Sequence, residues 1–133
     1  AVISAGDYFF PRLLAEFCSR HQDVRVELGV SNREEIVRLL AENTTDLAII
    51  MRPPQDMDII AEPFAPLPQV IVAPPGHRLA GRRRIALEAL ERESFIVRER
   101  GSDTRISMDG VFAERGFAPR IAMEIKSFET IKQ

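Results

Sequence analysis

Hydroxyl side chains occur at four expected strand-to-helix junctions, at residues 4–8, 31–33, 98–105 and 127–130. In an open α/β sheet, ligands bind beyond the carboxyl ends of the strands, where helix N-termini present unpaired N–H groups and the positive end of the helix dipole. Each hydroxyl could instead only cap its own helix, and for any single junction this is the simpler interpretation. Because the chain has only seven Ser and four Thr, hydroxyls at all four junctions favour a small polar ligand held between two lobes.

The densest junction is residues 98–105, with the sequence Arg-Glu-Arg-Gly-Ser-Asp-Thr-Arg. Guanidinium groups beside a glycine turn that precedes a helix suit a phosphate or a carboxylate. Asp103 opposes that interpretation, because a carboxylate in the loop repels an anion. Arg98 and Arg105 could also pair with nearby acids rather than with a ligand, namely Glu99, Asp103 and Asp109.

Catalytic and metal-binding chemistry finds little support in the sequence. Cys18 lies on the apolar stripe of the first expected helix, so we interpret it as core packing rather than as a nucleophile. His21 and His77 lack the i, i+4 partner of a helical metal site, and Glu34 and Glu35 are adjacent, so on a helix they point apart. There is no phosphate-loop glycine run and no G-x-S-x-G motif. We therefore predict a protein that is not an enzyme and has no metal and no cofactor.

The composition is that of a soluble globular domain, with 133 residues of which 45% are hydrophobic and 29% charged. No apolar run approaches the ~20 residues of a membrane span, and no signal-like leader opens the chain. A single cysteine excludes an internal disulfide framework, so we expect a cytoplasmic protein without a membrane partner. The net charge of -2 argues against general nucleic-acid binding, although residues 1–75 carry six Arg and eleven acids and residues 76–120 carry ten Arg and seven acids.

Hydrophobic periodicity predicts the elements that must position the junctions. Strands are expected at residues 1–4, 24–30 and 46–51, and helices at residues 10–18 and 33–40, with Ser31 or Asn32 as the cap of the second helix. This β-α-β-α-β order favours a parallel sheet, and we assign it to a first lobe at residues 1–58.

Seven of the nine prolines lie between residues 53 and 75, which predicts a hinge and crossover at residues 59–75. Strands are expected there at residues 59–64 and 69–73. A second, truncated lobe at residues 76–133 is expected to hold a short helix at residues 86–93, a strand at 95–98, a helix at 104–115 closed by Gly116, a strand at 121–125 and the start of a helix at Phe128.

Four short motifs follow one another along the chain: Tyr8-Phe9-Phe10-Pro11, Asn32-Arg33-Glu34-Glu35, Asp46-Leu47-Ala48-Ile49, and Val-Ala-Pro-Pro-Gly-His-Arg-Leu-Ala at residues 72–80. Together, in this order and spacing, they resemble the effector-binding domain of LysR-type transcriptional regulators. Within that family, residues 95–99, 101–102, 104–105 and 129–133 are most similar to regulators of carbon-fixation (ribulose bisphosphate carboxylase) operons.

The resemblance implies an α/β fold of two lobes like a type 2 periplasmic binding protein, with mainly parallel sheets, incomplete at the C-terminal end and with an inducer between the lobes. It also implies that the full regulator binds DNA through a separate N-terminal helix-turn-helix and forms a homodimer or homotetramer. This chain by itself is expected not to bind operator DNA, and apolar edges left open in the first lobe are expected to favour self-association.

Carried over by position, the resemblance assigns inducer contacts to all four junctions. The contacts are Ser4, then Ser31 and Asn32, then Ser102 and Thr104, then Ser127 and Thr130, and the charge pattern adds Arg98, Arg100 and Arg105. Related regulators tend to carry Gly and Asn where this chain has Asp103 and Phe128. These two differences could change which anionic metabolite the site accommodates.

Three functions are compatible with these features. The first is a non-catalytic sensor of a small anionic metabolite, such as a phosphorylated sugar or nucleotide, which controls transcription. The second is a solute-binding protein of a transport system, which an export signal upstream of Ala1 would favour. The third is a fragment of an α/β enzyme, for which turnover dependent on Glu99 or Asp103 would be decisive.

Overall fold

The computed structural model describes the backbone of residues 1–133 and every side chain except those of Ser4 and Tyr8. The chain divides into two compact units, one made of residues 1–62 with 101–103 and the other of residues 63–100 with 104–133. The loop at residues 101–103 thus belongs to the first unit although it lies late in the sequence. That residues 59–75 act as a hinge stays a prediction.

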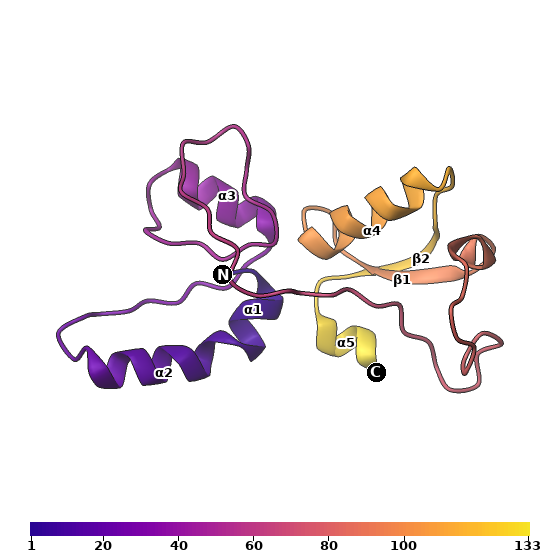
Figure 1. Cartoon of the computed structure of the whole chain (residues 1–133), viewed down its shortest axis with the longest axis horizontal. Helices are drawn as coiled ribbons and strands as arrows, with labels where there is room; N and C mark the ends of the chain where they lie inside the picture. Colours follow the sequence, from indigo (N-terminus) through magenta and orange to yellow (C-terminus); the bar gives the residue numbers. More distant parts are fainter. The chain divides into compact units, whose positions relative to one another are not determined.

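Three helices make up the regular structure of the first unit: α1 Ile3–Tyr8, α2 Phe10–Arg20 and α3 Arg33–Ala41. Pro11 lies in the first turn of α2, where its missing N–H costs no hydrogen bond. The apolar stripe of α2 faces solvent, since Leu13 is 44% and Phe17 is 41% exposed. The prediction that Cys18 packs in a core is therefore wrong, because it lies on this stripe and is exposed as well. Figure 1 shows the extended segment after α2 returning above that helix.

The start of the chain lies between two extended segments of the first unit. On one side the Ala1 ammonium donates to the Gly29 carbonyl at 2.7 Å, and the Ser31 N–H donates to the Ala1 carbonyl at 3.1 Å. On the other side the Val2 N–H donates to the Ile49 carbonyl at 3.0 Å. The parallel bridge between Val2 and Ser31 follows the predicted direction of the segments.

The regular strands predicted at residues 1–4, 24–30 and 46–51 are nevertheless not formed. A strand needs a hydrogen-bonded neighbour along its length. Only residues 1 and 2 lie between the two extended segments, because α1 begins at Ile3. The second and third segments therefore stay extended without a continuous ladder, and Val24, Val26 and Leu28 remain 38–44% exposed.

Helix α3 begins as the sequence predicts. The Asn32 side chain accepts a hydrogen bond from the Glu35 N–H at 3.0 Å, and two acidic residues in the first turn suit the positive end of the helix dipole. Ile36 is buried on the inner face of this helix.

The second unit contains a parallel two-stranded sheet, β1 Ser94–Arg98 and β2 Arg120–Ile125, joined through α4 Asp103–Glu114. Phe95 pairs with Ile121 and Arg98 with Ile125, with a register shift after Phe95. In Figure 1, α4 lies above the two strands and α5 Phe128–Lys132 lies below them. This β-α-β unit with its parallel sheet confirms the predicted α/β class.

Phe112 of α4 is the centre of the core of the second unit and is 1% exposed. Its ring makes edge-to-face contacts with Phe95 at 5.3 Å and with Phe117 at 4.9 Å between centroids. Leu79 and Leu90 complete the buried cluster. The core therefore joins the strand β1, the helix α4 and the segment that precedes β1.

Three predicted elements ahead of β1 are wrong. Residues 59–64 and 69–73 form no strand, and Ile60 is 96% and Val70 79% exposed. Prolines at 63, 66 and 68 cannot donate to a ladder, which is consistent with this result. The helix predicted at residues 86–93 is only the 3-10 helix η1 Leu87–Leu90. Among the described residues, no helix is both long and apolar enough to cross a bilayer.

Candidate functional site

The first unit brings two of the predicted junctions together. The Glu34 N–H, in the first turn of α3, donates to the Gly101 carbonyl at 3.3 Å. Gly101 has a φ of +83°, and a Cβ there would lie 2.6 Å from a carboxylate oxygen of Glu34. The positive φ therefore favours glycine at this position, while the contact with the flexible Glu34 side chain could be relieved by a rotation of that side chain.

Ser102 and Asp103 follow Gly101 and are both buried, with exposed fractions of 3% and 8%. The Asp103 carboxylate lies 3.2 Å from the Arg33 Nε and accepts a hydrogen bond from the Met51 N–H at 3.2 Å. The loop is thus tied both to α3 and to the end of the extended segment at residues 46–51. Burial raises the pKa of Asp103, while the Met51 N–H and the charges of Arg33 and Arg52 act in the opposite direction.

Arg33 is a functional candidate that the sequence reasoning missed. In the sequence it is only one residue of the Asn32-Arg33-Glu34-Glu35 motif, whereas in the structure its guanidinium balances the buried carboxylate of Asp103. One signal was available: a cation in the first turn of a helix opposes the dipole and therefore needs another reason to be there. Its acidic partner, 70 positions later in the chain, has no such local signal.

The predicted residues Ser31 and Asn32 have backbone and capping roles in the structure. Ser31 is half-buried and its N–H donates a hydrogen bond to the Ala1 carbonyl, while the Asn32 side chain caps α3. The side chain of Ser4, also predicted as a contact, lies outside the described side chains. The capping interpretation thus holds for Asn32, and a ligand role for these residues stays a prediction.

In the second unit, the guanidinium groups of two predicted arginines, Arg98 and Arg105, have carboxylate partners. Arg98 is 4% exposed and forms two hydrogen bonds with Glu99, at 2.8 and 2.9 Å, while its guanidinium lies 4.3 Å from the centre of the Phe128 ring. Arg105 pairs with Asp109 at 2.8 Å and with Glu124 at 3.2 Å. These contacts correspond to the ion-pair alternative that the sequence left open.

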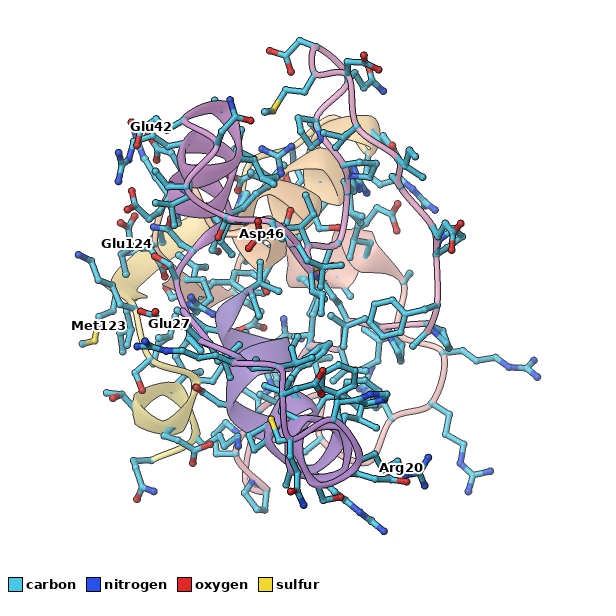
Figure 2. The ribbon with its side chains drawn as sticks, turned by 90° about the vertical axis from the view of Figure 1, so that its left-hand side faces the viewer. Arg20, Glu27, Glu42, Asp46, Met123 and Glu124 are labelled. Atoms are coloured by element: carbon cyan, nitrogen blue, oxygen red, sulfur yellow. The ribbon has the colours of Figure 1, made fainter. Side chains whose placement is uncertain are left out.

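Glu124 ties β2 to the loop after β1. Figure 2 labels this residue on β2. Besides the Arg105 guanidinium, its carboxylate accepts a hydrogen bond from the Arg100 N–H at 3.4 Å. The Arg105 guanidinium also donates to the Arg98 carbonyl at 3.3 Å. The arginines of this junction therefore hold their own loop in place.

The last junction is a helix cap. The Ser127 hydroxyl accepts a hydrogen bond from the Thr130 N–H at 3.3 Å at the start of α5. Ser127 and Thr104 are half-buried, and Thr130 is exposed. Among the described residues, no cluster of three His, Cys, Asp or Glu side chains has the arrangement of a metal site. These junctions combine hydroxyls, N–H groups and guanidinium groups with carboxylates that pair with the guanidinium groups.

The chain matches the family model described as "LysR substrate binding domain" over residues 1–133. It is 44% identical over 133 residues to a RuBisCO operon transcriptional regulator of Allochromatium vinosum, covering 100% of this chain and 44% of the relative. It is also 39% identical over 133 residues to the transcriptional activator CmpR of Synechocystis, covering 100% of this chain and 44% of the relative. The chain thus spans less than half the length of these relatives.

Two solved structures are similar to this chain. The CcmR regulatory domain of Synechocystis, in complex with 2-PG, has a TM-score of 0.92 and 39% identity, with 99% of this chain and 64% of that chain covered. The LysR family regulator HinK of Pseudomonas aeruginosa has a TM-score of 0.75 and 26% identity, covering 97% and 44%. These matches confirm the predicted fold and the resemblance to carbon-fixation regulators. The chain therefore belongs to the LysR substrate-binding domain family.

Proposed function

We propose that this chain is the sensor domain of a LysR-type transcriptional regulator of carbon-fixation genes, and that its effector is a small phosphorylated carboxylic acid such as 2-phosphoglycolate. The observation that carries this proposal is the match to the CcmR regulatory domain, which was solved with 2-PG, over 99% of this chain. The relatives that are named as regulators of RuBisCO operons support the same gene class.

The junctions of both units suit an anion with two acidic groups. In the first unit, Ser102 lies next to the capped start of α3. In the second unit, Thr104 and Ser127 stand at the starts of α4 and α5. Hydroxyls and helix N–H groups bind phosphate and carboxylate oxygens without requiring a net positive charge. The proposed contacts are those predicted from the sequence, Ser4, Ser31, Asn32, Arg98, Arg100, Ser102, Thr104, Arg105, Ser127 and Thr130.

Arg98 and Arg105 would contribute by exchanging partners, since their guanidinium groups already contact carboxylates. Arg100 is exposed, and its backbone N–H is the group that contacts Glu124. A ligand phosphate could therefore recruit Arg100 without breaking a buried ion pair. We expect Arg100 to contribute charge and the hydroxyls to contribute geometry.

We further propose that the intact regulator acts in the cytoplasm as a homodimer or homotetramer and contacts DNA through a separate helix-turn-helix. The domain would act by binding and not by catalysis, without a metal or cofactor. An effector that binds one conformation more tightly than another shifts the population between them. The relatives named above are transcriptional regulators, which favours this function over a transport protein or an enzyme.

Thermal denaturation of the full-length protein with 2-phosphoglycolate, glycolate and inorganic phosphate tests the proposal. A ligand at 100 times its dissociation constant adds about 2.7 kcal/mol of stability. We expect this shift with 2-phosphoglycolate at a lower concentration than with either simpler compound. S102A and T104A should each weaken binding about tenfold, since one lost hydrogen bond to an anion costs roughly 1.5 kcal/mol or more.

S19A is the matched control, because Ser19 lies on α2 and its hydroxyl donates to the Glu16 carbonyl of the same helix. It should leave the dissociation constant unchanged. The proposal is wrong if none of the three compounds shifts the melting temperature. The assignment of the site is wrong if S102A and T104A behave like S19A.

A further inference from the structure

Asp103 is a buried carboxylate placed between Ser102 and Thr104, the two hydroxyl residues of the proposed site. One oxygen contacts the Arg33 Nε and the other accepts the Met51 N–H, each at 3.2 Å. The carboxylate side chain is 7% exposed, and that of Arg33 is 24% exposed. The loop therefore holds a negative charge of its own where the function proposed above requires an anion to bind.

We propose that Asp103 is a specificity-determining residue that acts as an internal counter-anion: an effector phosphate displaces its carboxylate from Arg33, or binds together with a proton taken up by Asp103. This inference rests on the proposed function. According to this inference, Asp103 and Arg33 determine how much negative charge the bound effector can carry.

The first argument is competition for the same donors. Asp103 is the first residue of α4, a helix of 12 residues, so its carboxylate lies at the positive end of the helix dipole. It also engages the Arg33 guanidinium, which has the fork geometry that suits phosphate. An effector phosphate near Ser102 can interact with the start of α4 and with the Arg33 guanidinium only to the extent that the Asp103 carboxylate releases them.

The second argument is that a dianion and an ionised Asp103 repel each other strongly in a buried loop. Two like charges that share a site push one of them towards its neutral form. Burial already raises the pKa of Asp103, so protonation requires less additional free energy than for an exposed Asp. Uptake of one proton is therefore the direct way to relieve the repulsion.

The groups around Asp103 decide how large this effect is. From α3 it faces Arg33, and from the extended segment it faces the Met51 N–H, with Arg52 acting at longer range. On its own helix, Arg105 is turned to Asp109 and Glu124. Arg33 is thus the cation that an incoming phosphate would share with Asp103.

Calorimetric titration of the full-length protein with 2-phosphoglycolate tests the inference. The titration is carried out at several pH values from 6 to 8, each in two buffers of different ionisation enthalpy. The difference between the two observed binding enthalpies gives the number of protons taken up per ligand bound. The ligand phosphate itself titrates near pH 6, and this contribution is the same for every variant. The difference in proton uptake between wild type and D103N therefore reports on Asp103.

We expect D103N to bind 2-phosphoglycolate at least tenfold more tightly than wild type at pH 7.5, and to take up fewer protons per ligand. Asn keeps an oxygen that can accept the Met51 N–H. D46N is the matched control, because Asp46 is exposed in the same unit and the charge change is identical (Figure 2). It should bind the ligand like wild type.

Equal affinity and equal proton uptake in D103N, D46N and wild type would overturn the inference and leave the proposed function standing. Absence of binding in all three proteins would overturn the proposed function and the inference with it. If D103N does not fold, carboxyl NMR of wild-type protein gives the answer. Saturation with 2-phosphoglycolate must raise the apparent pKa of Asp103, and an unchanged or lowered pKa overturns the inference.

Discussion

Replacing Glu99 by Ala should destabilise the second unit by about 3–5 kcal/mol, because it leaves the Arg98 guanidinium buried without its carboxylate. The two residues are 4% and 5% exposed, and two hydrogen bonds join them at 2.8 and 2.9 Å. Water cannot take the place of the lost carboxylate unless the loop opens. The contact of Arg98 with the Phe128 ring, at 4.3 Å, is already made in the wild type, so it does not offset this cost.

The size of the effect distinguishes this pair from a surface ion pair. Glu16 and Arg20 on α2 are 55% and 70% exposed, so E16A should cost no more than about 1 kcal/mol. Replacing Arg98 and Glu99 together by Met removes both charges at similar volume. The double variant should therefore lose much less stability than E99A alone.

Hydrogen–deuterium exchange of the full-length protein, read at the amides of β1 and β2, measures the stability of this unit directly. A loss of 3 kcal/mol corresponds to a more than hundredfold increase in the exchange rate of the slowest amides. Exchange in E99A that is no faster than in E16A would show that Arg98 finds another partner or reaches water. The interpretation of the pair as a buried structural contact would then be wrong.

Three further predictions concern single features of the two units. F112A should lower the stability of the second unit by about 3–5 kcal/mol, because Phe112 is 1% exposed and contacts two other rings, and urea denaturation measures the loss. N32A should lower the stability of the first unit by about 1 kcal/mol, whereas N32D keeps an oxygen for the Glu35 N–H and should restore it; equal stabilities of N32A and N32D would contradict the cap. The pKa of Asp103 in the folded protein lies above its usual value of 3.8, so its contribution to stability is fully present below pH 3.8 and is lost as the pH rises through the folded-state pKa. The unfolding free energy of wild type relative to D103N should therefore fall as the pH rises through this range, and a relative free energy that rises with pH would contradict the direction of the shift.

Local sequence signals predicted the second unit well from β1 to the end of the chain, but not the segment ahead of β1. Residues 95–98 and 121–125 were predicted as strands and correspond to β1 and β2, and the helix predicted at residues 104–115 is α4, one residue earlier at each end. Gly116 was predicted to close this helix, and it has a φ of +79° there. Alternation, helical periodicity and a glycine C-cap are all properties of short stretches of sequence, so they can be read without knowing the fold.

The strands predicted in the first unit failed for a physical reason. Alternation of Val24, Val26 and Leu28 shows that a segment could be half-buried in a sheet, but it does not supply the neighbouring strand. In the structure, Ala1 and Val2 provide three hydrogen bonds between two extended segments, and α1 begins immediately afterwards. A hydrogen-bonded ladder depends on pairing between residues that are distant in the sequence, and alternation within one segment does not predict this pairing.

The partners of the charged residues were the least predictable part of the candidate site. Arg105 and Asp109 are four residues apart on a helix, so their pairing was among the alternatives that the sequence offered. Arg33 and Asp103 come together only because the loop at residues 101–103 folds into the first unit. Nothing in the neighbourhood of either residue indicates the other.

The internal ion pairs determine how an anion could bind at the arginine-rich junction. The sequence of residues 98–105 left open whether its guanidinium groups bind an anion or pair with acids. In the structure Arg98 and Arg105 contact carboxylates, and so does Arg33 in the first unit. An anionic effector therefore cannot bind to such a junction through net charge alone. To use Arg33, Arg98 or Arg105 it must replace a carboxylate that already contacts the guanidinium, so its affinity depends on matching that geometry while supplying further contacts of its own. A sensor built in this way rejects ions that carry the charge but lack the shape, which is the discrimination that a regulator responding to one metabolite among many requires.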